Sequence, residues 1–301
     1  MTYHRNTVNT RLVSVIFIVV KRFLVVVCCL GFIALAFADV NGFVDAGRRG
    51  ILLFGRNVLP VLFPFFFVSG LLVELGFFKG FGRFGKAAPV FALSLLSGYP
   101  TGARLLGDLY KRGEITRQQA IRTATYTSTC SPIFIIATLG ACFYQSTAVG
   151  VLVFTAHMLG ALANGIVFCK VPFKDTSLRA EAKQPLQTAD AISNSLYSAI
   201  QNILAVGGLI TVFFIVTDML GGGFLLSSLF EMTNGVFQAS LVSPSLIIPT
   251  AIVTFGGLSV AMQGFVFMSS FRMPFWFYLL YKTTHTVFAC MICLILSNVF
   301  V

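Results

Sequence analysis

The sequence predicts an all-α, polytopic membrane protein with roughly six transmembrane helices plus two re-entrant helical hairpins in an inverted repeat. Three observations lead to this fold class. Of the 301 residues, 57% are hydrophobic and 10% are charged, whereas an ordinary soluble domain carries about a quarter charged residues. Long apolar stretches recur along the chain, and some of them are interrupted by glycine-rich breaks. A segment of the first half also aligns with a segment of the second half.

Six stretches meet the length of about 20 apolar residues that a helix needs to cross the hydrocarbon layer. They cover residues 16–38, 52–75, 121–142, 147–169, 192–218 and 275–299. The first follows basic residues and closes with Ala36-Phe37-Ala38, as a secretory signal does. Its charged region is unusually long, which favours a retained, signal-like anchor over a cleaved signal peptide.

Two further apolar stretches contain a break. Residues 87–107 are interrupted at 97–102 (SGYPTG), and residues 246–270 at 255–259 (FGGLS). A broken helix exposes backbone polar groups that lipid cannot satisfy, so each break must be buried in protein or line a wet cavity. Basic loops flank the first stretch on both sides, and basic loops are expected on the cytoplasmic side of the membrane. Both loops can lie on that side only if the stretch turns back within the membrane. The sequence therefore predicts two re-entrant hairpins, with both termini in the cytoplasm.

The net charge of +11 comes from Lys and Arg in short loops between apolar runs, so it reads as an orientation signal and not as a nucleic-acid surface. The seven cysteines lie in apolar or near-apolar stretches without disulfide spacing. The sequence shows no nucleotide-binding glycine loop, metal-ligand cluster or nucleophile constellation. We therefore expect no enzyme, no cofactor, no metal and no nucleic acid. The expected partners are the lipid bilayer and a small-molecule solute. The sequence does not decide whether the protein forms a homo-oligomer.

Shifting the chain by 145 residues aligns 45–76 with 190–221 without a gap and pairs Asn57 with Asn202. If the first broken stretch does not cross the membrane, three crossings separate the starts of the two copies, and this odd number predicts that the second copy is inverted. Inverted repeats with broken helices in matching positions indicate a solute site near the membrane midplane. The expected organisation is an N-terminal span (1–44), repeat A (45–170), a cytoplasmic linker (171–189) and repeat B (190–301). A duplicated protein that only holds partners together is the alternative.

Polar residues at the breaks and in the hydroxyl-rich run 123–131 are the candidate substrate-binding residues. They are Asn57, Ser97, Gly98, Tyr99, Pro100, Thr101, Gly102, Ser128, Ser131, Pro132, Asn202, Gly256, Gly257, Ser259 and Gln263. Glycines permit close backbone approach, and Pro132 should kink its helix. The alternative is that the hydroxyls bond their own backbone or a neighbouring helix. Lys282 and His285 are further candidates, because burying an ionisable side chain in the bilayer interior costs free energy and such residues usually have a function. The alternative for Lys282 is that its side chain extends to the membrane surface.

Several blocks resemble the YlbJ-type sporulation integral membrane proteins. They are Leu96–Arg104, Asp108–Lys111, Ser131–Ile136, Glu231–Gly235 and Phe255–Val260. That family is placed in the nucleoside-recognition, or gate, group, which shares its hairpins with concentrative nucleoside transporters. The resemblance implies a role in endospore formation, in carrying dipicolinate across the outer forespore membrane. The chain departs from the pattern at residues 127–130 and at Ala261, which bears on the substrate more than on the fold.

The expected function is transport of a small polar solute across the cell (inner) membrane, with dipicolinate or a similar planar carboxylate first. A nucleoside-like solute and a non-transporting sporulation scaffold are the alternatives. Helix N-termini at the breaks would favour an anion. Arg104 would help only if its side chain reached the cavity.

Overall fold

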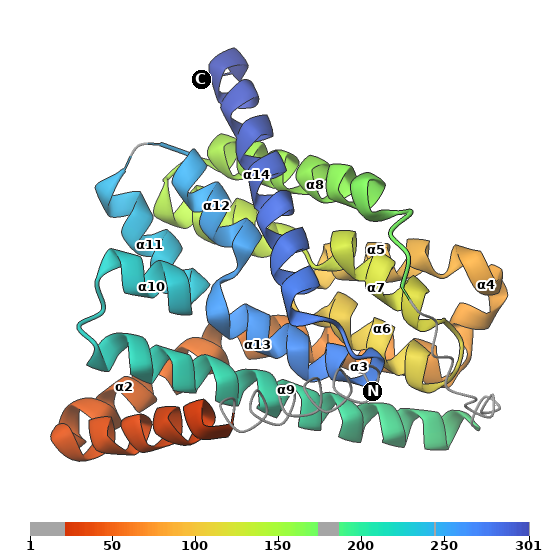
Figure 1. Ribbon diagram of the computed structural model, residues 1–301, viewed down its shortest axis with the longest axis horizontal. Helices are drawn as coiled ribbons and strands as arrows, with labels where there is room; N and C mark the ends of the chain where they lie inside the picture. The colour runs from red at the N-terminus through yellow and green to blue at the C-terminus, as the bar shows by residue number, and fades with distance from the viewer. Residues whose placement is uncertain (1–21, 174–186, 244, 301) are drawn as a thin grey trace, which may run out of the picture.

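The computed structural model describes residues 22–173, 187–243 and 245–300 of the chain. Every regular element in these ranges is a helix (Figure 1). Five helices there are long and apolar enough to cross a membrane: Val40–Glu74, Thr147–Phe168, Thr188–Met219, Ile247–Phe271 and Phe275–Val299. The expected all-α membrane fold is confirmed. Residues 16–21 of the expected first span and 174–186 of the expected linker lie outside the described residues.

The elements follow one another with short connections. The helix Arg22–Ala38 precedes α2 (Val40–Leu53), η1 (Phe54–Val58), α3 (Leu59–Glu74), η2 (Phe77–Phe81), α4 (Gly82–Gly85), α5 (Ala87–Ser97), α6 (Thr101–Lys111), α7 (Arg117–Thr127), η3 (Ile133–Phe143) and α8 (Thr147–Phe168). The second half contains α9 (Thr188–Met219), α10 (Phe224–Phe230), α11 (Met232–Val242), α12 (Ile247–Phe255), α13 (Gly257–Met268), η4 (Ser269–Phe271) and α14 (Phe275–Phe300).

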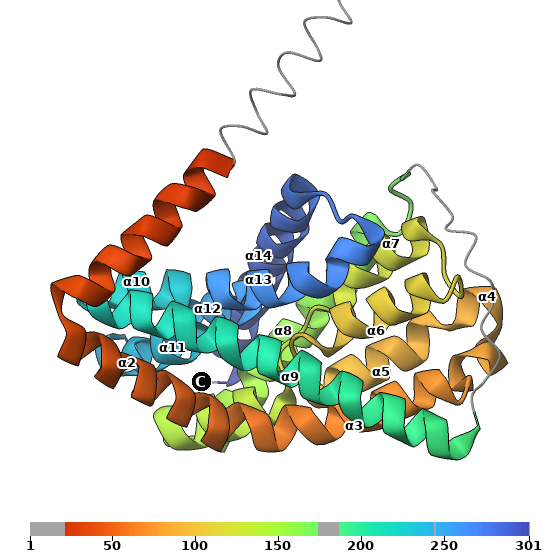
Figure 2. The same cartoon turned by 90° about the horizontal axis from the view of Figure 1, so that it is seen from below.

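The two segments that align in the sequence pack against each other as antiparallel neighbours. At one end Arg49 forms an ion pair with Asp218, and at the other end Gly70 lies against Ser195. Residue numbers therefore rise along α2 and α3 while they fall along α9. Figure 2 shows α9 lying along the continuous helix from α2 to α3. This arrangement is compatible with inverted copies of one segment.

The first predicted break produces a helical hairpin. A side chain added at Gly102 would lie 2.5 Å from the Ser94 hydroxyl, so α5 and α6 approach closely just beyond the break. At the open end of the hairpin, Lys86 Nζ lies 3.0 Å from Glu114 Oε2. Both side chains are almost fully buried there, and the ion pair joins the residue before α5 to the segment after α6. The chain thus enters and leaves this hairpin at the same end.

The second break bends a helix. Gly256 adopts φ 87° and ends α12, and α13 begins at Gly257. Beyond it the chain continues in a new direction, with α12 packed on α14 and α13 packed on α6 and α9 (Figure 1). A second hairpin is therefore not confirmed. The physical reason is that α12 and α13 pack against different helices, which holds the chain in a bend at the two glycines.

The expected span 121–142 is interrupted. Helix α7 ends at Thr127, and a non-helical segment over residues 128–131 precedes the π-helix η3. Pro132 does more than kink a continuous helix, because the four residues before it leave the helical conformation altogether. Their backbone groups are buried within protein, as the bilayer requires of irregular backbone. One of them, the Cys130 amide, donates to His157 Nε2 at 3.0 Å.

Candidate functional site

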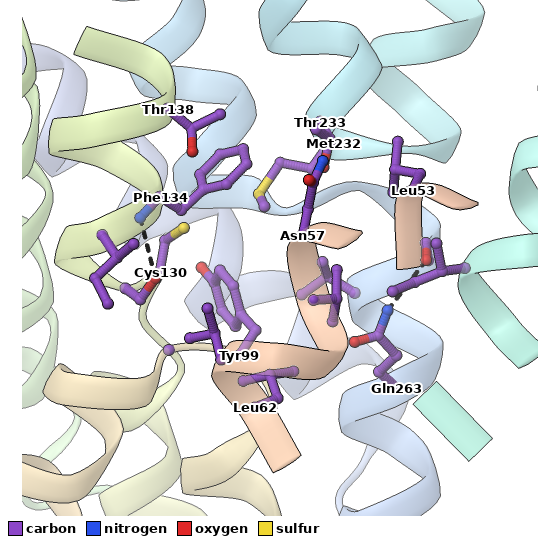
Figure 3. A pocket seen from close by; sticks show the side chains of 18 of the residues that line it. Leu53, Asn57, Leu62, Tyr99, Cys130, Phe134, Thr138, Met232, Thr233 and Gln263 are labelled. Carbon is purple, nitrogen blue, oxygen red and sulfur yellow. Dashed lines mark hydrogen bonds between the residues drawn. The ribbon is translucent and has the colours of Figure 1, made fainter. Parts of the chain in front are cut away.

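A cavity of about 130 Å³ lies where both breaks and the non-helical segment 128–131 approach one another. Its wall is formed by η1 and α3, the α5–α6 break, the start of η3, the start of α11 and the first turns of α13 (Figure 3). Nine apolar side chains line the cavity: Leu53, Val58, Val61, Leu62, Ile133, Phe134, Ile210, Met232 and Val260. The polar lining is Asn57, Ser97, Tyr99, Cys130, Ser131, Thr138, Glu231, Thr233, Ser259 and Gln263. A concave site in which polar groups converge between apolar side chains is typical of small-molecule binding.

Seven of the predicted site residues meet at this cavity: Asn57, Ser97, Gly98, Tyr99, Ser131, Ser259 and Gln263. Tyr99, Asn57 and Gln263 reach it from three different elements (Figure 3). Gln263 Nε2 donates to Ser259 Oγ at 3.2 Å, so these two α13 side chains act as a unit.

Two of the hydroxyls have local partners as well. Ser131 Oγ accepts from the Phe134 amide at 3.2 Å and thereby caps the start of η3. Ser97 Oγ donates to the carbonyl of Leu93, one turn back in α5, at 2.7 Å. The alternative of local bonding therefore holds for these two residues, although both still line the cavity.

The other eight predicted residues lie outside the cavity lining: Pro100, Thr101, Gly102, Ser128, Pro132, Asn202, Gly256 and Gly257. Asn202 donates to Ser198 Oγ on its own helix, so it does not share a site with Asn57. Ser128 Oγ donates to the Ala124 carbonyl in α7. Gly102 allows the close contact between α5 and α6, and Thr101 is fully buried behind the wall. None of these eight residues lines the cavity.

Sequence reasoning missed thirteen of the lining residues, among them Cys130, Phe134, Thr138, Glu231, Met232 and Thr233. The first three follow α7, where the sequence reads as an unbroken span. The last three lie at the α10–α11 connection, which only the tertiary fold brings to the cavity. The one available signal for them was that Glu231 opens a block shared with the resembled family.

Four helices begin at or beside the cavity. The break at Gly98 and Tyr99 precedes α6, Ser131 precedes η3, and Glu231 precedes α11, while Ser259 lies in the first turn of α13. Each helix is at least eleven residues long. Helix N-termini carry partial positive charge, so this wall favours negatively charged groups. Side chains of the protein cap two of the four: Ser131 accepts an amide of η3, and Glu231 accepts an amide of α11.

The protein supplies one negative group of its own. Glu231 is 5% exposed and its Oε2 accepts from the Asn234 amide at 2.8 Å, which caps α11. Burial raises the pKa of the Glu231 carboxyl, and hydrogen bonds from Asn234 and Thr233 offset that rise in part. No Lys or Arg side chain of the described residues lines the cavity.

Arg104 does not reach the cavity. Its Nη1 donates to the Phe66 carbonyl at 2.7 Å and to Ser69 Oγ at 3.1 Å, and its guanidinium lies over the Phe66 ring. The side chain is 1% exposed, so it joins α6 to α3 within the interior. It faces a separate, charged hollow that it shares with Glu74 and Asp108. An anion in the cavity therefore has no contact with this guanidinium.

Comparison with known proteins identifies one relative. The chain is 29% identical over 282 residues to "Sporulation integral membrane protein YlbJ" of Bacillus subtilis (strain 168), with 73% of this chain and 69% of that protein covered. The YlbJ-type resemblance is confirmed. The blocks that carried it include the first break, the start of η3, the start of α11 and the second break, which all border the cavity. No family profile matches the chain, and no solved structure does.

Proposed function

We propose that this protein is a permease for a small polar solute, and that the cavity binds a planar dicarboxylate of the dipicolinate type during endospore formation. The observation that carries the proposal is the convergence of four helix N-termini on one cavity inside a helical membrane protein. The YlbJ-type relative is named for sporulation. Membership of the gate group, a re-entrant first hairpin and cytoplasmic termini belong to the same proposal, as does a place in the outer forespore membrane.

The size of the cavity favours a solute with a single ring. A cavity of about 150 Å³ in a protein core holds one benzene molecule, and this cavity measures about 130 Å³. A nucleoside, which joins a base to a ribose, needs the walls to open further. Apolar side chains such as Phe134 and Leu62 suit the faces of a planar ring.

The charge of the cavity sets a condition on an anionic solute. Partial positive charge at the helix N-termini favours carboxylates, whereas the ionised form of Glu231 opposes them. Because burial raises the pKa of Glu231, its carboxyl is protonated at a higher pH than an exposed glutamate. A dicarboxylate therefore binds best when Glu231 carries a proton.

Binding to the purified protein tests this proposal. We expect saturable binding of dipicolinate, and weaker or no binding of uridine. Gln263→Ala removes an amide from the wall and should weaken dipicolinate binding roughly tenfold, since a hydrogen bond to a charged group contributes about 1.5–3 kcal/mol. Gln201→Ala, on an exposed part of α9, is the matched control and should bind as wild type does.

Two outcomes would contradict the proposal in different ways. Saturable binding of uridine without binding of dipicolinate would make the protein a nucleoside permease. If neither solute binds, and cells with Gln263→Ala sporulate normally, the protein is a scaffold.

A further inference from the structure

Lys282 is a fully buried lysine without a carboxylate partner. It lies in α14 with 0% exposure, and its Nζ donates to Tyr99 Oη at 2.7 Å and to the Thr254 carbonyl. Nζ also lies 4.6 Å from the centroid of the Tyr99 ring. Within the described part of the chain, no Asp or Glu lies within ion-pair distance of Nζ. A buried ammonium without a counter-charge is costly, so such residues in membrane proteins mark functional sites.

The two partners of Lys282 belong to the two breaks. Tyr99 lies in the α5–α6 break and lines the solute cavity, and Thr254 lies in the last turn of α12, just before Gly256. Tyr99 Oη also donates to the Thr254 carbonyl at 3.0 Å. One amine therefore joins both breaks directly behind the cavity wall. Any change in its charge acts on the elements that shape the solute site.

Among the described residues, the titratable groups around Lys282 include no carboxylate. Cys130 from the segment before η3, His157 from α8 and Tyr99 face it from other elements, and His285 faces it from α14. Tyr278 and Tyr281 of α14 in turn face Tyr99. His157 Nε2 accepts the Cys130 amide, so its Nδ1 carries the hydrogen and donates to Thr254 Oγ1 at 2.9 Å. A second proton on His157 would break the bond to Cys130. His285 Nε2 donates to the His157 carbonyl at 3.0 Å.

Both charge states of Lys282 have hydrogen-bond partners. As an ammonium, Nζ donates to Tyr99 and Thr254 in the observed arrangement. As an amine, Nζ has a lone pair that accepts from the Tyr99 hydroxyl if that hydroxyl turns from the Thr254 carbonyl. The ammonium form of Lys282 has hydrogen-bond partners but lacks, in the part of the chain that the structure describes, a negative charge nearby to stabilise it. The solute cavity, which Tyr99 also lines, is where a carboxylate supplies that charge.

We propose that Lys282 takes up one proton when a carboxylate solute enters the cavity, which makes the protein a proton-coupled carboxylate carrier. This inference rests on the proposed function, because it names the coupling ion of the same site. The proton from solvent adds to the Nζ lone pair to form the ammonium, and it leaves when the solute leaves. Unit charges within about 10 Å change each other's binding roughly tenfold at the effective dielectric of protein interiors. Linkage makes the coupling reciprocal, so the solute raises proton affinity as much as the proton raises solute affinity.

Calorimetry with dipicolinate at one pH, in two buffers of different ionisation enthalpy, counts the protons taken up on binding. For wild type we expect at least one proton per solute bound, and Glu231→Gln, in which the cavity carboxyl cannot titrate, should retain about one. In this Glu231→Gln background, Lys282→Met should bind roughly tenfold more weakly and take up none. Lys282→Arg keeps a permanent charge, so in the same background it should bind without proton uptake. Lys170→Met, an exposed position, is the matched control and should behave as wild type does.

Further experiments test the proton coupling separately from the proposed permease function. Glu231→Gln should keep the proton uptake, and loss of uptake in that variant alone would assign the proton to Glu231 and overturn the role of Lys282. The comparison of two buffers with wild-type protein needs no variant, so it tests the coupling even if a variant fails to fold. Dipicolinate that binds to wild type without proton uptake overturns the coupling and leaves the permease intact. If dipicolinate does not bind, both fail together.

Discussion

Replacing Gly98 by alanine should destabilise the protein by about 3 kcal/mol, more than most single substitutions. Gly98 adopts φ 78°, a left-handed conformation that alanine enters at a cost. The added Cβ would also lie 2.5 Å from the Ser131 amide nitrogen, an atom of the backbone that cannot rotate away. The break in the first hairpin and the segment before η3 would have to separate, and both line the cavity.

Thermal unfolding of the purified protein measures this effect. We expect a Tm lower by roughly 5–10 °C for Gly98→Ala. Gly208→Ala, on α9 with open space around its Cβ position, is the control and should leave Tm unchanged or slightly raised. Equal Tm values for the two variants would show that the close contact between Gly98 and Ser131 does not exist.

Replacing Glu231 by glutamine should strengthen dipicolinate binding about tenfold at high pH, where the wild-type carboxyl is ionised and repels the solute. The raised pKa of Glu231 results first from burial, so the folded state favours the protonated form. Wild-type affinity should therefore be highest at low pH and fall as pH rises through that pKa. The contribution of Glu231 to the free energy of unfolding also falls as pH rises. It is complete below the pKa that Glu231 has in the unfolded chain, and it is lost as pH rises through the pKa of Glu231 in the folded protein.

A pH series of dipicolinate binding separates this effect from a general loss of charge. Glu231→Gln should remove the part of the pH dependence that this carboxyl causes, and Asp45→Asn, at an exposed position, should keep the wild-type curve. Lys282→Met weakens binding, whereas Glu231→Gln strengthens it, so the two titrating groups are distinguished by sign. Weaker binding by Glu231→Gln at high pH would mean that its carboxylate contacts the solute through a donor, as a nucleoside offers.

The first break was predictable because the signal is local. Glycine and proline at positions 98–102 exclude a continuous helix, and apolar sequence on both sides requires that the break be buried. The second break was equally visible, but its geometry was not. Whether glycines at 256 and 257 reverse the chain or bend it depends on the packing of α12 and α13 against other helices, which no local pattern records.

Other members of the site required the tertiary fold. Glu231 follows a short helix in a loop that reads as external, and only the packing of α10 and α11 brings it to the cavity. Asn202 repeats Asn57 in sequence, yet η1 is a π-helix and α9 is regular at that point, so the two side chains project differently. Pro132 predicted a kink, whereas the four residues before it unwind because their polar groups find partners in α8 and in η3.

Uptake of labelled dipicolinate into proteoliposomes tests the central claim most directly. Val61→Phe places a ring in a cavity of about 130 Å³, and Val151→Phe makes the same change on the exposed face of α8. The account predicts saturable uptake by wild type and Val151→Phe, and at least a tenfold lower rate for Val61→Phe at equal protein content. Uptake by Val61→Phe at the wild-type rate would show that dipicolinate does not pass through this cavity.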